Sequence, residues 1–162
     1  MCPSSFYFES CVGLVQIEPQ LPLYPQKAEL LGSHRFQGLT MLLFEDSLHL
    51  LDKELKQLDK LQFEGTQKLT SMNGMYVGTQ NGVLIKVSIS SENKIVILQQ
   101  TQLKNRAIMQ IQPLKDQILI IFEKNNQILY TNDTFKVLKE FRLNLKCSNE
   151  NILVEGQEII IL

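Results

Sequence analysis

The chain has 162 residues, of which 44% are hydrophobic and 20% are charged, a composition that fits one globular domain with a substantial core. Its net charge of −1 does not favour nucleic-acid binding, and it contains no polybasic stretch that would favour an anionic membrane. Its apolar runs are too short for a membrane helix, and its first residues lack the positive start of a signal peptide. We therefore expect an intracellular protein.

Residues 1–38 predict an irregular, proline-containing segment. Pro19, Pro22 and Pro25 divide the stretch 12–24 into short extended pieces, because proline fixes its own φ and restricts the residue before it. We expect this segment to form an edge strand or to wrap around the outside of the domain.

From residue 39 onward, four segments share one template, in which an apolar run, a short polar turn and a second apolar run follow one another. The paired runs are 41–44 with 48–51, 75–77 with 83–87, 118–122 with 128–130, and 152–154 with 159–162. Their residues are largely β-branched or aromatic, so each segment predicts a tight antiparallel hairpin. The strongest turn signal is Asn81-Gly82, because both residues tolerate positive φ, and Asn125-Asn126 and Glu155-Gly156 are weaker signals.

The segment 48–62 has two interpretations. Leu48, Leu51, Leu55 and Leu58 stand at helical spacing, and the stretch 52–62 is charged and free of Gly and Pro, which is typical of an amphipathic helix. We favour a strand, a turn near 52–54 and a second strand at 57–63, because the hairpin template requires them. The helix stays open as the alternative.

Further strands are predicted between the hairpins. A polar turn at 90–93 precedes an apolar run at 95–98, and the run 107–111 is expected to open the next unit. After the third hairpin, Asn132-Asp133 turns the chain, and apolar and polar residues alternate over 135–141. Alternation with a period of two is typical of a half-exposed strand at the outer edge of a sheet.

The four hairpins recur at intervals of roughly 34 to 43 residues, close to the period of about 40 to 45 that marks a four-stranded propeller blade. The predicted fold is therefore all-β, a partial β-propeller of three to four antiparallel blades over residues 39–162. A β-sandwich or an OB-like barrel is the alternative.

Propellers close with four or more blades, because an open array leaves apolar faces without neighbours. We expect an incomplete ring and a fragment of a longer protein. Completion of the ring by a partner chain or by a second copy stays open.

Residues 69–87, which include the run Met75-Tyr76-Val77-Gly78-Thr79, resemble the start of a citron homology (CNH) domain. Residues 107–138 are similar to the next blade in the propeller of the vacuolar-sorting HOPS and CORVET tether subunits, and the resemblance covers about 66–142. It implies a protein-interaction scaffold in endolysosomal vesicle tethering and small-GTPase-linked trafficking. The partners it implies are small GTPases or other tether subunits, and the location is the cytoplasm near endosomal or vacuolar membranes.

The residues predict no catalytic, cofactor or metal site, and we expect that the protein is not an enzyme. His34 falls in a polar loop and His49 inside the first hairpin, where a structural or surface role is expected, and no metal-binding or P-loop motif is present. The acidic pair Glu45-Asp46 is expected to be solvated in a turn. Three widely spaced cysteines indicate reduced thiols.

The predicted function is protein–protein interaction, with no binding residue assigned. The alternatives are a generic WD-repeat-like propeller subunit of a larger complex and an OB-like nucleic-acid-binding module. The second alternative needs a basic groove with aromatic side chains, which the sequence does not indicate.

Overall fold

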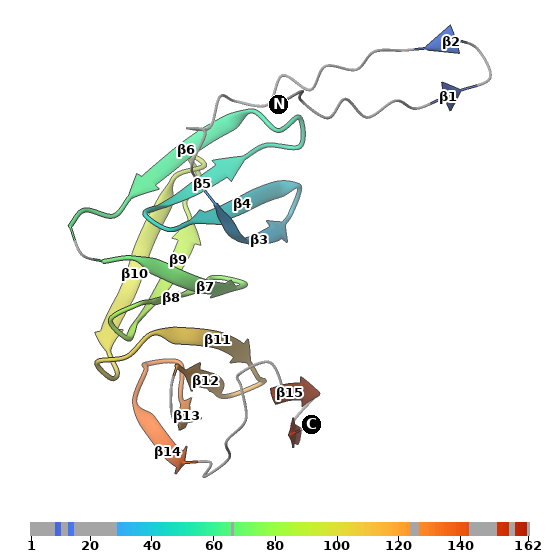
Figure 1. The fold of residues 1–162 in the computed structure, drawn as a ribbon. Coiled ribbons are helices and arrows are strands. Elements are labelled where there is room, and N and C mark those ends of the chain that lie inside the picture. The colour runs from blue at the N-terminus through green and yellow to red at the C-terminus, as the bar shows by residue number, and fades with distance from the viewer. Residues whose placement is uncertain are drawn as a thin grey trace.

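The computed structural model describes residues 29–65, 67–123 and 127–142, together with the backbone of four short strands near the two ends of the chain. Those strands are β1 (Glu9–Ser10), β2 (Gly13–Leu14), β15 (Ile152–Glu155) and β16 (Glu158–Ile161), which pair as two hairpins. The described residues between them form three four-stranded antiparallel sheets, which follow one another in chain order (Figure 1).

Each sheet is a simple meander of consecutive strands. The first contains β3 (Leu30–Phe36), β4 (Leu39–Phe44), β5 (Ser47–Leu51) and β6 (Gln57–Gln62). The second contains β7 (Leu69–Asn73), β8 (Tyr76–Thr79), β9 (Val83–Ile89) and β10 (Ile95–Gln102). The third contains β11 (Ile108–Pro113), β12 (Ile118–Phe122), β13 (Gln127–Thr131) and β14 (Val137–Arg142). The first strands begin at residues 30, 69 and 108, so the unit repeats every 39 residues.

The core lies between successive sheets. Met41, Leu43 and Leu50 of the first sheet pack against Val77 and Ile85 of the second, and all five side chains are at most 2% exposed. A second cluster joins Leu84 to Ile118, Ile120 and Phe122 of the third sheet. Alternate residues of β12 point to the opposite face, where Leu119 and Ile121 pack with Ile128. Strands covered on both faces explain the continuous apolar runs of the predicted hairpins.

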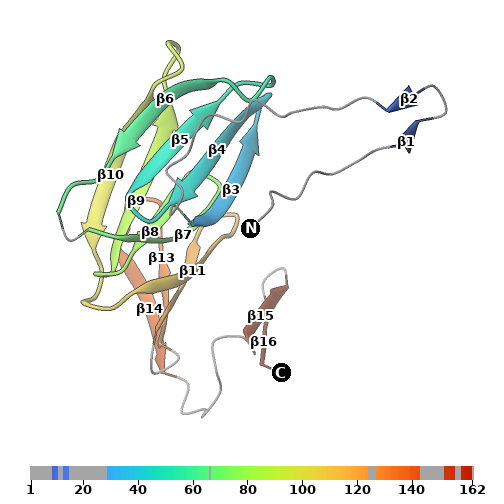
Figure 2. The same cartoon turned by 45° about the horizontal axis from the view of Figure 1, so that its top comes forward.

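Polar side chains also join the sheets, at both edges. At the inner edge, the hydroxyls of Thr70 and Ser71 donate to the carbonyl of Ile108 over 2.6 and 2.8 Å. At the outer edge, the backbone N–H of Ile95 donates to the Asp59 carboxylate over 2.7 Å. Figure 2 shows the corresponding strands β6 and β10 running side by side.

One turn recurs between the third and fourth strand of each sheet. A side-chain oxygen of Asp52, Ser90 or Asn132 accepts hydrogen bonds from the backbone N–H groups two and four residues later, and that last residue is always a lysine. The residue before the lysine is Leu55, Asn93 or Phe135, and each has a positive φ between 57° and 64°. Short polar side chains that bond their own backbone favour such turns.

The four hairpin predictions are confirmed by paired strands within residues 41–51, 75–87, 118–130 and 152–161. The strand interpretation of 48–62 is also confirmed, because β5 and β6 form there with a turn between them. The sheets do not join into a closed barrel in the described part of the chain. The turns at 124–126 and 156–157, the three cysteines and the prolines of the first segment lie outside the described residues.

Three expectations differ from the structure. Strand β3 begins at Leu30, so the first sheet starts before the boundary expected at residue 39. His34 lies in this strand and not in a loop. The turn at Asn81-Gly82 has positive φ only at Gly82, whose N–H donates to the Thr79 carbonyl over 3.1 Å, and the loop between β8 and β9 covers residues 80–82.

Gly82→Ala is expected to destabilise the fold by about 3 kcal/mol, because two costs add. Gly82 has a φ of 78°, and a Cβ there would lie 2.2 Å from the Lys104 carbonyl oxygen. Gly38→Ala is the matched control, because Gly38 has a φ of 83° but no heavy atom within 4 Å of the added Cβ. We expect only about 1 kcal/mol for the control. Equal losses in urea unfolding would contradict the crowding at Gly82.

Thr131→Val is expected to leave stability unchanged or to raise it by up to about 1 kcal/mol. Thr131 is fully buried, and its hydroxyl has no hydrogen-bond partner within the described residues, so valine removes an unsatisfied polar group at similar shape. Thr79→Val is the control, because the equally buried Thr79 hydroxyl accepts the Val83 N–H over 3.0 Å. Thermal unfolding should show a loss for Thr79→Val alone.

Candidate functional site

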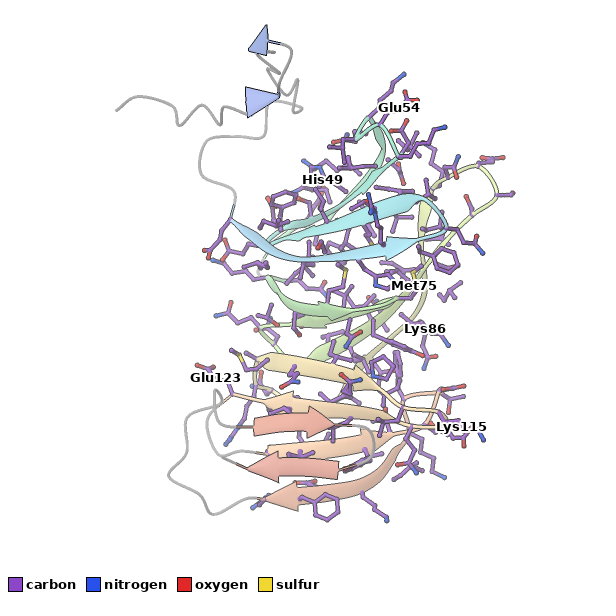
Figure 3. The ribbon with its side chains drawn as sticks, turned by 90° about the vertical axis from the view of Figure 1, so that its right-hand side faces the viewer. His49, Glu54, Met75, Lys86, Lys115 and Glu123 are labelled. Atoms are coloured by element: carbon purple, nitrogen blue, oxygen red, sulfur yellow. The ribbon has the colours of Figure 1, made fainter. Side chains whose placement is uncertain are left out.

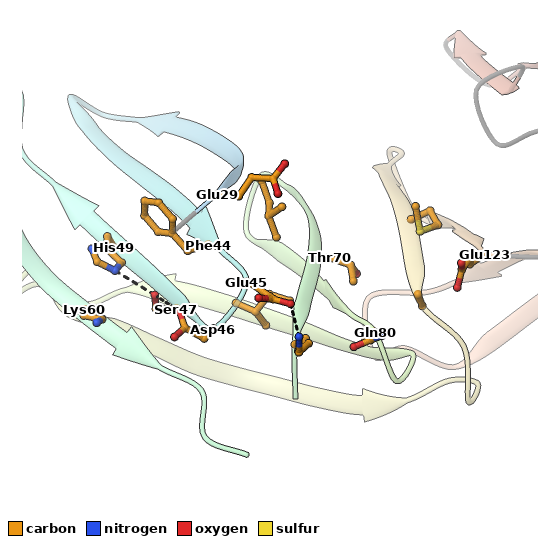
Figure 4. Close-up of a pocket in the computed structure, with 15 residues that line it drawn as sticks. Glu29, Phe44, Glu45, Asp46, Ser47, His49, Lys60, Thr70, Gln80 and Glu123 are labelled. Carbon is orange, nitrogen blue, oxygen red and sulfur yellow. Dashed lines mark hydrogen bonds and ion pairs between the residues drawn. The ribbon is translucent and has the colours of Figure 1, made fainter. Parts of the chain in front are cut away.

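A groove of about 670 Å³ crosses all three sheets at one end of their strands (Figure 4). It lies on the face that carries the β4–β5 and β8–β9 turns and the links that join one sheet to the next. Figure 3 shows Glu123 at this end of the molecule and Glu54 and Lys115 at the opposite end.

The inner side of the groove is built from one repeated irregularity. The first strand of each sheet contains a bulge, at Leu31 in β3, Thr70 in β7 and Met109 in β11, and all three residues line the groove. A bulge inserts one unpaired residue and changes the direction of its side chain. Leu31 and Met109 are consequently 37% and 43% exposed, although they belong to the innermost strands.

The floor of the groove is held by backbone hydrogen bonds between turns and links. The Leu69 N–H donates to the Glu45 carbonyl over 2.7 Å, and the Gln80 N–H donates to the Lys68 carbonyl over 2.8 Å. In the third sheet the Glu123 N–H donates to the Ala107 carbonyl over 2.9 Å. The bonds of Gln80 and Glu123 are equivalent in the second and third sheets, whereas the Leu69 bond joins the second sheet to the β4–β5 turn of the first.

The groove carries more negative than positive charge. Its carboxylates belong to Glu29, Glu45, Asp46 and Glu123, and its ammonium groups belong to Lys60 and Lys68. Lys68 lies 2.6 Å from Glu45. The Ser47 hydroxyl donates to Asp46 over 2.9 Å and is the main cause that lowers the pKa of this carboxyl. Glu45 and Asp46 are exposed in the β4–β5 turn, as expected, and they also line the groove.

His49 lies under one end of the groove and is only 6% exposed, in agreement with a structural role. Its Nε2 is 3.2 Å from the Ser47 hydroxyl, its Nδ1 is 3.0 Å from the Gln57 side-chain oxygen, and its ring meets Phe44 edge-on. Burial lowers the pKa of His49 below the ordinary value, against the opposing effect of the Gln57 hydrogen bond.

This polar cluster is not arranged as a hydrolytic triad. In a triad the histidine stands between the nucleophile and the acid, so that it takes the proton and is oriented by the carboxylate. Here Ser47 stands between Asp46 and His49, and it is 2% exposed. Among the described residues, no group of three or more His, Cys, Asp or Glu side chains is placed to hold a metal ion. The same part of the chain contains no helix that is long and apolar enough to cross a membrane.

This architecture recurs among solved structures. The WD40 domain of Neurospora crassa Pan2 superposes with a TM-score of 0.54 at 10% identity, over 70% of this chain and 36% of that one. The described sheets are propeller-like blades. A protein of unknown function from Bacteroides caccae superposes with a TM-score of 0.58 at 10% identity, over 91% of this chain and 62% of that one.

The predicted all-β propeller fold is thereby confirmed, and the chain spans less than two thirds of either similar structure. No protein-family model and no curated protein matches the chain, so nothing specific to a CNH domain accompanies the propeller fold.

Sequence reasoning assigned no residue to this groove. Its inner residues Leu31, Thr70 and Met109 stand 39 residues apart, like the strands that carry them. The 39-residue spacing could have indicated these positions. Because the three residue types differ, however, their equivalence is recognised only once the strands are known.

Stability is expected to fall as the pH drops below about 6.5, because His49 binds a proton less readily in the folded than in the unfolded state. When the pKa of a histidine is lower in the folded state, protonation at acidic pH favours the unfolded state, and the protein loses stability. His49→Gln should therefore weaken this dependence in urea unfolding between pH 7 and pH 5. The control His34→Gln retains His49 and should keep the wild-type profile. An identical pH profile for all three proteins would contradict the role of burial.

Proposed function

We propose that this chain is a protein-interaction scaffold without catalytic activity, and that the groove is its docking surface. The supporting observation is that equivalent positions of three stacked sheets supply the groove, with exposed apolar side chains at Leu31 and Met109 beside charged ones. Rigid frameworks that display turns and links at one face are suited to binding. Apolar surface that lines a groove and is rimmed by polar residues is typical of interaction sites.

The lack of a triad geometry at Ser47 and His49 supports the non-catalytic part of the proposal. Both side chains are also buried beneath the groove, where they pack within the first sheet and are shielded from a substrate. The groove then acts through shape and charge.

We further propose that the scaffold belongs to the CNH type and serves endolysosomal vesicle tethering. The resemblance over residues 66–142 supports this, because its limits coincide with the second and third sheets, from β7 to β14. The partners under this proposal are small GTPases or other tether subunits, met in the cytoplasm at endosomal or vacuolar membranes.

Met109→Asp is expected to weaken capture of the partner about tenfold or more, because a charge replaces an exposed apolar contact in the groove. Leu98→Asp on β10 is the control, since Leu98 is 60% exposed and lies outside the groove. Proximity labelling with the chain fused to a biotin ligase measures the effect in cells. Enrichment of endosomal proteins that is lost with Met109→Asp, but kept with Leu98→Asp, supports both proposals.

Enrichment that is equally sensitive to both variants, or to neither, contradicts the groove as the docking surface. Enrichment of partners unrelated to endosomes, with the expected sensitivity to Met109→Asp, contradicts only the trafficking role.

A further inference from the structure

We infer that the partner segment that docks in this groove is cationic and carries an apolar anchor. Its lysine or arginine side chains would meet Glu29 and Glu123, and its apolar side chain would pack on Met109. The inference rests on the proposed docking function of the groove and adds the chemistry of the partner.

The first step concerns which charges are already compensated. Glu45 is paired with Lys68 at 2.6 Å, and Asp46 accepts hydrogen bonds from Ser47 and Gln62 at 2.9 Å each. Lys60 acts on the Asp46 end of the groove, where it helps to lower the pKa of that carboxyl. The side-chain carboxylates of Glu29 and Glu123 make no hydrogen bond or ion pair with other described residues. Among the described residues that line the groove, the uncompensated charge is therefore negative.

The second step concerns where these two carboxylates lie. In Figure 4, Glu29 and Glu123 stand on either side of Thr70, so they form two separate negative points along the groove. Separate carboxylates suit successive basic side chains of one extended segment better than a single bound cation, which needs its ligands around one point.

The third step concerns the apolar surface near these points. Met109 is 43% exposed at the β11 bulge, in the sheet that also supplies Glu123. Leu31 is 37% exposed at the β3 bulge, two residues after Glu29. Methionine is flexible and polarisable, and it adapts to different apolar partners. The groove thus combines an adaptable apolar contact with negative charge, and its 670 Å³ has room for several side chains of a peptide.

The test uses the whole chain and three fluorescein-labelled dodecapeptides with the same apolar residues and either Lys, Gln or Glu at the alternating polar positions. Fluorescence anisotropy at low and high salt measures binding. We expect the Lys peptide to bind at least roughly tenfold more tightly than the Glu peptide, with a difference that shrinks as salt is added.

The double variant Glu29→Gln/Glu123→Gln is expected to weaken binding of the Lys peptide roughly fivefold, as two exposed ion pairs imply. Glu92→Gln/Asp116→Gln is the matched control, because it removes the same charge from exposed turns at the opposite end of the strands. The control should bind the Lys peptide like the wild type.

Equal binding of the three peptides, or equal effects of the two double variants, would overturn the cationic assignment. If Met109→Asp still abolishes capture of the cellular partner in that case, the docking function of the groove stands and only the chemistry of the partner falls. If neither Met109→Asp nor the groove double variant changes any binding, both proposals fall.

Discussion

The stacking of each sheet on the next is the contact on which the rest of the structure depends. It is closest at the inner edge between the second and third sheets, where two hydroxyls donate to the one carbonyl of Ile108. Gly78 permits this approach, because a Cβ there would lie 2.6 Å from the Ile108 side chain. A single four-stranded sheet has two apolar faces and cannot bury both alone, so each sheet is stable only through its neighbours. The two clusters between the sheets are the result.

Stacking at a fixed repeat also builds the groove. Because the first strands begin 39 residues apart, their bulges are brought to the same level at the same end of the molecule. The residues that follow β8 and β12 are then tied to the residues before β7 and β11 by equivalent backbone hydrogen bonds, and the turn after β4 accepts a hydrogen bond from Leu69 of the second sheet. The three sheets differ in the side chain at the bulge, which is leucine in the first, threonine in the second and methionine in the third.

The recurring turn between the third and fourth strands adopts one backbone conformation with different residues at its positive-φ position. Its positive-φ position is occupied by Asn93 in the second sheet, a residue that adopts this conformation at low cost. Phe135 occupies it in the third sheet and is 3% exposed, with its ring 6.2 Å from Tyr76 of the second sheet. Burial of an aromatic side chain against the neighbouring sheet offsets the conformational cost there. Leu55 in the first sheet is 45% exposed, so the same offset is absent among the described residues.

The sequence by itself determined the hairpins, because β-branched apolar runs and polar turn residues act locally and fix where strands begin and end. It also determined the repeat and hence the propeller fold, since the spacing of the runs survives without knowledge of contacts. It did not reveal β3, whose residues Leu30–Phe36 are largely exposed and lack an apolar run. Only the tertiary structure decided which residues form the groove. Leu31, Thr70 and Met109 are far apart in the chain, and their meeting depends on how three sheets stack and where each bulge falls.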